Sequence, residues 1–134
     1  MYRLTYIALG VSTLVCSFAN TAQAENIVPL KRGYYVTTNV PCSQASNATL
    51  TLFTGKSFGL NCSAKVQQIH GQTFKILQVC HIKDERIESV GTYRVLNDRE
   101  YVIENEHGEL RNRFCEQTQL PGPWSRNDLS DITK

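Results

Sequence analysis

The sequence lacks the short motifs that mark most catalytic and metal-binding sites. It contains no C-x-x-C or H-x-x-x-H pair, which excludes the usual ligand spacing of structural zinc sites. None of its histidines, His70, His81 and His107, lies near a serine in a recognisable nucleophile–base motif. We therefore predict that the protein is not an enzyme, with no catalytic residue, metal or cofactor to assign. A small hydrolase is the alternative.

A strong charge of one sign is also lacking. One of the 14 Lys and Arg residues, Arg3, lies in the first 24 residues, which leaves 13 basic and 12 acidic residues and a net charge of +1 in residues 25–134. Nucleic-acid-binding domains favour a strongly basic face, so we expect no nucleic acid as partner. No run after residue 24 is apolar for the ~20 residues that a membrane-spanning helix needs, so we expect no membrane span after signal removal.

The N-terminus has the three parts of a secretory signal peptide. Arg3 supplies a short positive region, residues 7–19 form an apolar run, and Ala-Gln-Ala at 22–24 is a small-x-small cleavage site. The apolar run is short for a bilayer span, so an uncleaved anchor is the less favoured alternative. We predict that residues 1–24 are a cleaved signal peptide, that residues 25–134 form a single small β-rich domain, and that the protein is periplasmic or secreted.

The predicted mature chain has four cysteines, Cys42, Cys62, Cys80 and Cys115. An even number of cysteines in an exported chain of this size indicates disulfides. Four cysteines allow three pairings, and we favour Cys42–Cys62 with Cys80–Cys115, because these join near neighbours and leave two sequential units. A bridge that closes a loop of about 20 residues stabilises a fold by roughly 3 kcal/mol.

Runs rich in β-branched and aromatic residues alternate with turn residues along the chain, which is typical of strands. No segment has the apolar stripe and caps of a helix. The run at 73–82 is apolar on both faces, which favours a central strand. The sequence thus predicts an all-β protein, a small antiparallel meander that closes into a barrel or sandwich of about seven or eight strands. The expected strands are 34–39, 48–53, 58–62, 66–69, 73–82, 87–96, 101–104 and 110–115.

The C-terminal tail has a different composition. It begins at Glu116, contains a Pro-Gly-Pro-Trp sequence at 121–124, and ends in polar residues. Polar chain ends commonly fray, so we expect a frayed tail. Trp124 could fold back as a plug over the open end of the barrel.

One candidate binding segment is a small polar loop beside the first cysteine. Ser43, Ser46 and Asn47 lie in it, between Cys42 and the second expected strand. A rigid β-scaffold that presents such a loop is a common arrangement for binding. An ordinary connection between strands is the alternative.

The second candidate is a pair of arginines in the last expected strand. Arg111 and Arg113 are two residues apart, so their side chains project from the same face. Guanidinium groups bind carboxylates through two parallel hydrogen bonds, and the pair could form a partner-binding patch, which Arg94 and Arg99 from a neighbouring hairpin could join. Cross-strand pairing of the arginines with Glu100 or Glu104 is the structural alternative.

In size, predicted export and cysteine-linked strands, the chain resembles small exported bacterial β-barrel proteins, including the periplasmic inhibitors of lysozyme. It lacks the Ser-Gly pair of their binding loop and the glycine, tryptophan and lysine pattern near the C-terminus, so no residue role is transferred. The resulting hypothesis is an exported, non-enzymatic binding protein of the bacterial periplasm, an inhibitor of an envelope or foreign enzyme. Its partner would be a protein of the envelope or outside the cell. The alternative is an accessory or structural component of an envelope secretion or conjugation assembly.

Overall fold

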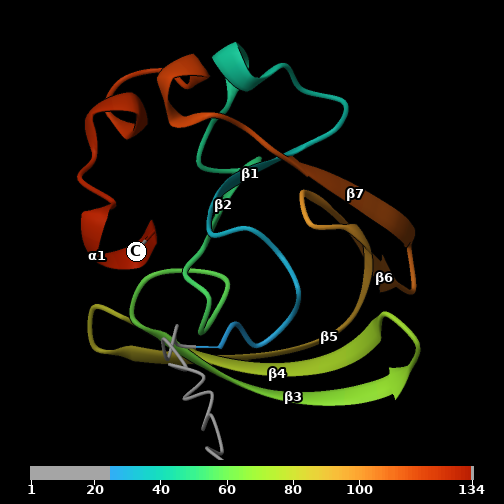
Figure 1. Ribbon diagram of the computed structural model, residues 1–134. Coiled ribbons are helices and arrows are strands. Elements are labelled where there is room, and N and C mark those ends of the chain that lie inside the picture. The colour runs from blue at the N-terminus through green and yellow to red at the C-terminus, as the bar shows by residue number, and fades with distance from the viewer. Residues whose placement is uncertain (1–24, 134) are drawn as a thin grey trace, which may run out of the picture.

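The computed structural model describes residues 25–133, so the predicted signal peptide lies outside the described part of the chain. The described residues form an all-β fold in which a single antiparallel sheet curls into a half-barrel (Figure 1). The strands are β1 (Gly33–Thr37), β2 (Leu50–Phe53), β3 (Cys62–His70), β4 (Thr73–Ile82), β5 (Glu85–Asn97), β6 (Glu100–Asn105) and β7 (Gly108–Phe114). The short helices are η1 (Cys42–Gln44), η2 (Gln117–Gln119), η3 (Trp124–Arg126) and α1 (Ser130–Thr133).

The strand order is β2-β1-β7-β6-β5-β4-β3, with every neighbouring pair antiparallel. Strands β3 to β7 form a continuous meander, and the β1–β2 pair joins this meander through contact of β1 with β7. The expectation that residues 73–82 form a central strand is confirmed, since β4 pairs with β3 on one side and with β5 on the other. The predicted meander is therefore present, with seven strands.

The inner core lies within the curl of the sheet. Aromatic rings dominate it: Phe58 lies with its ring centroid 4.8 Å from those of Phe53 and Tyr93 and 5.2 Å from that of Tyr101. Such ring pairs stabilise beyond the area they bury. The buried members of this core are Val28, Leu30, Tyr35, Phe53, Phe58, Phe74, Ile76, Val95 and Tyr101.

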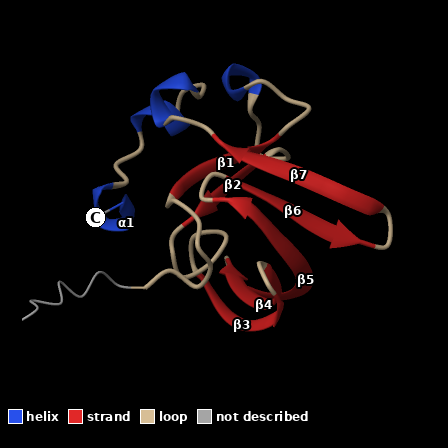
Figure 2. Ribbon diagram, turned by 45° about the vertical axis from the view of Figure 1, so that its right-hand side comes forward, coloured by secondary structure: helices blue, strands red, loops and turns tan. Residues whose placement is uncertain are grey.

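A second core covers the outer face of β1 and β2, so that β1 is buried on both faces. Figure 2 shows the C-terminal helices gathered beside these two strands. The tail is thus packed against the sheet instead of frayed, because its apolar side chains are part of this outer core. Trp124 lies against this outer core and does not plug the barrel. The apolar tail residues in this core are Leu120, Trp124, Leu129 and Ile132.

The disulfides join Cys42 to Cys115 and Cys62 to Cys80, so the predicted pairing of sequence neighbours is wrong. Strand β7 ends beside Tyr35 of β1, and the segment around η1 packs back onto the outer face of β1, which brings Cys42 to Cys115. The register of β3 and β4 places Cys62 directly opposite Cys80. The two bridges are therefore nested in the sequence, and they do not divide the chain into two sequential units.

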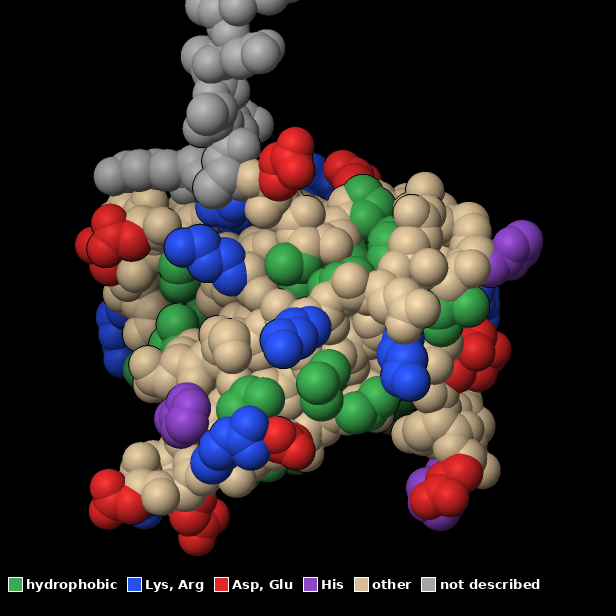
Figure 3. Space-filling view, turned by 90° about the horizontal axis from the view of Figure 1, so that it is seen from below, with side chains coloured by type: hydrophobic (Ala, Val, Ile, Leu, Met, Phe, Trp, Pro, Cys, Tyr) green, Lys and Arg blue, Asp and Glu red, His purple; other side chains and the backbone are tan. Residues whose placement is uncertain are grey.

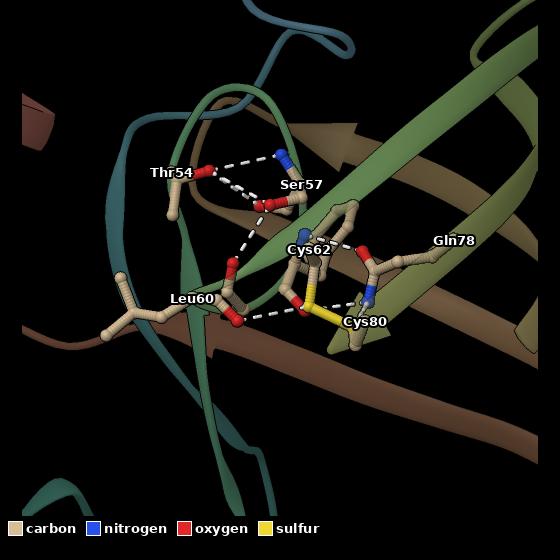
Figure 4. The surroundings of a disulfide bond; sticks show 8 residues. Thr54, Ser57, Leu60, Cys62, Gln78 and Cys80 are labelled. Atoms are coloured by element: carbon tan, nitrogen blue, oxygen red, sulfur yellow. Dashed lines mark hydrogen bonds between the residues drawn. A yellow bond between two sulfur atoms is a disulfide. The ribbon is translucent and has the colours of Figure 1, made fainter. Parts of the chain in front are cut away.

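The segment at 58–62, expected to be a strand, forms only an isolated bridge between Phe53 and Phe58. Its place in the fold depends on Gln78, a buried residue of β4. The Gln78 side-chain amide donates to the carbonyl oxygen of Phe58 at 2.8 Å and accepts from its N–H at 2.7 Å. Figure 4 shows the Gln78 amide and its hydrogen bonds beside the Cys62–Cys80 bridge. One side chain thus supplies the two hydrogen bonds of a β-ladder and fastens the loop across the opening of the half-barrel.

Candidate binding surface

The polar loop predicted as a binding segment lies at the end of the sheet where β1 ends. Ser43 is in η1, and Ser46 forms a turn in which its N–H donates to the Thr49 hydroxyl at 2.9 Å. Ser43, Ser46 and Asn47 are all exposed, while Ala45 between them is buried in the outer core. The loop is therefore a solvent-exposed surface on a fixed base, and its role in binding stays a prediction.

Arg111 pairs with Glu100 on the neighbouring strand, the alternative to a partner-binding role. Its Nε and Nη2 atoms donate to Glu100 Oε2 at 2.9 and 2.6 Å across the β6–β7 pair. These hydrogen bonds hold the pKa of the Glu100 carboxyl below its usual range. The guanidinium of Arg111 is therefore engaged within the protein.

Arg113 is used to hold the chain that leads into the polar loop. Its guanidinium donates to the carbonyl oxygens of Thr37 at 3.2 Å and Val40 at 2.7 Å. The structure thus brings Arg113 and the polar loop to the same end of the sheet. Arg111 and Arg113 share a face as expected, but each is bonded to groups of the protein itself.

Ion pairs continue along the outer face of β5, β6 and β7. Arg94 contacts Glu104 Oε1 through Nε at 3.2 Å and Glu109 Oε1 through Nη2 at 3.0 Å. The hydrogen bond to Glu104 is the largest cause of the raised pKa of Arg94. Arg99 Nη1 lies 3.6 Å from Glu116 Oε1, and the Arg99 guanidinium makes a cation–π contact with the ring of Phe114. These charges are compensated internally, and the four arginines do not combine into a free anion-binding patch.

The outer face of β3, β4 and β5, which we call the convex face, is different. Its β-ladder sets Lys65, Leu77 and Val90 in one row across the three strands, with Val79 in the next row. Val90 is 61% exposed, and Leu77 and Val79 are half-buried. A shallow groove of about 540 Å³ crosses this face. Figure 3 views the molecule from this side and shows hydrophobic side chains separated by Lys and Arg side chains.

The charges of the convex face are incompletely compensated. Arg86 is paired with Glu88 at 2.7 Å. Lys65 and Lys75 are exposed, and among residues 25–133 neither has a carboxylate within ion-pair distance. The convex face thus combines apolar side chains with unbalanced positive charge. The apolar pair Leu77 and Val79 was visible in the sequence as the second face of a central strand, but the sequence alone could not tell whether another layer covers it.

A larger cleft, of about 750 Å³, lies where the N-terminal segment and the tail meet the sheet. The cations at its rim are engaged: Lys31 Nζ lies 4.6 Å above the ring of Phe114, and Arg32 donates to the carbonyl oxygen of Ile132 at 3.1 Å and to Asn26 Oδ1 at 2.7 Å. These contacts fasten the tail to the start of β1. The cleft is a seam between parts of one chain, and it presents no nucleophile beside a base.

Three tyrosines, two buried and one partly buried, belong to the inner core. Burial raises the pKa of Tyr35, Tyr93 and Tyr101. The Tyr35 hydroxyl donates to the carbonyl oxygen of Lys31 at 2.7 Å. These phenols are protonated at neutral pH, and that of Tyr35 ties the start of β1 to the segment before it.

No group of three or more His, Cys, Asp and Glu side chains in residues 25–133 is arranged to hold a metal ion. Within the same described residues, no helix has the length and apolar character needed to cross a membrane. Comparisons of the chain with known protein families, with curated proteins and with solved structures found no match.

Proposed function

We propose that the protein is an exported, non-enzymatic binding protein that engages another protein through the convex face. The observation that carries this proposal is the uncovered apolar strip of Leu77, Val79 and Val90 on a sheet whose neighbouring outer surfaces are covered by the tail or by ion pairs. Exposed apolar side chains that gather on one face, rimmed by polar groups, mark interaction sites in soluble proteins.

Two disulfides support the compartment part of the proposal, because such bonds persist in oxidising environments such as the periplasm or the cell exterior. A sheet braced in this way is also a rigid platform, and interfaces on pre-formed surfaces lose less conformational entropy on binding. An inhibitor of an envelope or foreign enzyme would use such a platform.

Site-specific photocrosslinking tests the proposal. A photoreactive amino acid replaces Val90 in one variant, Asn47 of the polar loop in a second, and Thr118, an exposed tail residue, in a third. We expect one discrete protein adduct from Val90 in cells or envelope extract, absent at Thr118. An adduct at Asn47 alone would show that the polar loop, and not the convex face, is the binding site. No adduct at any position would refute the proposal.

Two further measurements separate the rival functions. Co-fractionation of the Val90 adduct with a large envelope complex would identify an assembly component instead of an inhibitor of a free enzyme. Turnover of ester or glycan substrates by the purified protein, at a rate above that of a mock preparation, would show that the protein is a hydrolase and would refute the non-enzymatic function.

A further inference from the structure

The free edge of β3 gives the convex face a specific mode of binding. β3 is the last strand of the sheet, nine residues long, and pairs only with β4 among the described strands. The opposite edge strand, β2, has four residues and is bridged by Phe58 at its end. The long edge is therefore the one that remains open for another strand.

The ladder shows which backbone groups point outward. In an antiparallel pair, facing residues alternate between those that exchange backbone hydrogen bonds and those that do not. The His81 N–H donates to the Asn61 carbonyl oxygen at 3.0 Å, while the adjacent facing pair, Cys62 and Cys80, has the close Cα separation of 4.0 Å typical of a pair without such bonds. Continuing the alternation, Ala64 and Val66 direct their N–H and C=O groups away from β4.

These outward groups have no other partner. Among residues 25–133, no hydrogen bond outside the sheet ladders involves the backbone of Ala64 or Val66. An edge of this kind is a template for strand addition. Natural edges are commonly blocked by proline, which β3 lacks; its protection is a single lysine, Lys65, and an irregular register near His70.

We infer that the β3 edge binds an extended segment of a partner protein in which apolar and acidic residues alternate. This inference rests on the proposed function and specifies its site and partner. A residue placed opposite Lys65 would project onto the convex face and extend the row of Lys65, Leu77 and Val90, so a carboxylate there meets an uncompensated ammonium group. Residues opposite Ala64 and Val66 project to the other side, where both side chains pack against the inner core, so apolar residues fit there.

Charge argues against a second copy of the chain as the occupant. The nine residues of β3 include one lysine and no aspartate or glutamate. In the antiparallel registers that pair most of β3 with itself, the two lysines lie opposite or diagonal to each other on one face, with no carboxylate to pair with them. Like charges in such positions destabilise strand pairs. An acidic partner strand removes this repulsion.

The test uses the oxidised protein and a blocked nine-residue peptide of alternating valine and glutamate, matched in length to β3. NMR hydrogen exchange should show the Ala64 and Val66 amides becoming protected on peptide addition, whereas the Lys65 amide is protected already. A peptide of alternating valine and lysine should bind more weakly. The valine–glutamate peptide N-methylated at each valine, the residues whose N–H groups would donate to Ala64 and Val66, should not bind.

Two variants of the protein complete the test. Lys65→Gln should weaken peptide binding by about twofold to fivefold, the range expected for one cross-strand charge pair, and Lys75→Gln, on the neighbouring strand, should change it less. Ala64→Pro removes an outward N–H, which edge strands tolerate, and should abolish binding. The N-methylated peptide keeps the inference falsifiable if Ala64→Pro does not fold.

Unchanged exchange at Ala64 and Val66, or equal affinity for the lysine and glutamate peptides, would overturn the inference. Protection that rises with protein concentration in the absence of peptide would overturn it in favour of self-pairing. A Val90 adduct together with a negative peptide experiment would refute only the edge mode, whereas failure of both would refute the proposed function as well.

Discussion

The contact between Gln78 and Phe58 can be tested by replacing Gln78 with methionine, which has a similar length but no hydrogen-bonding amide. The substitution leaves the N–H and C=O groups of Phe58 without partners at a buried position. Each unsatisfied buried polar group costs about 1–3 kcal/mol. Because the loop can shift and partly rehydrate, we expect a combined loss of about 2–4 kcal/mol in the free energy of unfolding, a large share of the ~5–15 kcal/mol typical of small domains.

Urea unfolding with both disulfides intact measures this loss. Gln67→Met is the matched control, because Gln67 is an exposed glutamine on β3, and exposed substitutions usually change stability by less than about 0.5 kcal/mol. Near-ultraviolet circular dichroism should change only in the Gln78 variant, since Phe58 stacks on Tyr93. A loss no greater than that of the control would refute the view that this side chain closes the half-barrel.

Three other predictions concern the disulfides, an ion pair and the tail. In the chain-entropy picture, removing the Cys42–Cys115 bridge, with a sequence separation of 73, should cost about 4 kcal/mol, and removing the Cys62–Cys80 bridge, with a separation of 18, about 3 kcal/mol; mass spectrometry of a non-reduced digest checks the pairing. Arg111→Gln should lower stability by roughly 0.5 kcal/mol at neutral pH. Because the folded-state pKa of Glu100 is lowered, this contribution is fully present above the ordinary glutamate pKa of 4.5 and is lost as the pH falls from there through the lowered pKa, which unfolding curves at several pH values would show. Leu120→Ala should cost about 2–4 kcal/mol in urea unfolding, since this leucine is buried in the outer core, and a loss below that of an exposed leucine variant would mean that the tail adds no stability.

The positions of most strands could be predicted from the sequence because they depend on local alternation. The run at 73–82 coincides with β4, and its two apolar faces correctly indicated a central strand. The segment at 58–62 also contains apolar residues, yet it lacks a neighbouring strand, and its one ladder-like contact comes from a glutamine side chain. Hydrogen bonds from a single side chain to the backbone produce no periodic pattern in the sequence, so this contact could not be predicted.

The disulfide pairing could not be predicted because it depends on contacts between distant parts of the chain. Proximity in sequence favoured Cys42 with Cys62. The native partner of Cys42 is instead set by the pairing of β1 with β7, which depends on the order of all the strands in the sheet. The same holds for the candidate site. The alternation in residues 73–82 showed two apolar faces, but only the folded chain shows that the tail covers β1 and β2 and leaves Leu77 and Val79 uncovered.

The nested arrangement of the disulfides has a consequence for biosynthesis. In the export that we propose, the cysteines would cross the membrane in the order Cys42, Cys62, Cys80, Cys115. A vectorial oxidant would meet Cys42 and Cys62 first, yet these two cysteines belong to different native bridges. A bond formed between them must be exchanged before the two native bridges can form, and exchange of this kind takes seconds to hours, depending on the oxidant and the isomerase. We expect the yield of the native protein to depend on a disulfide isomerase and not only on an oxidase.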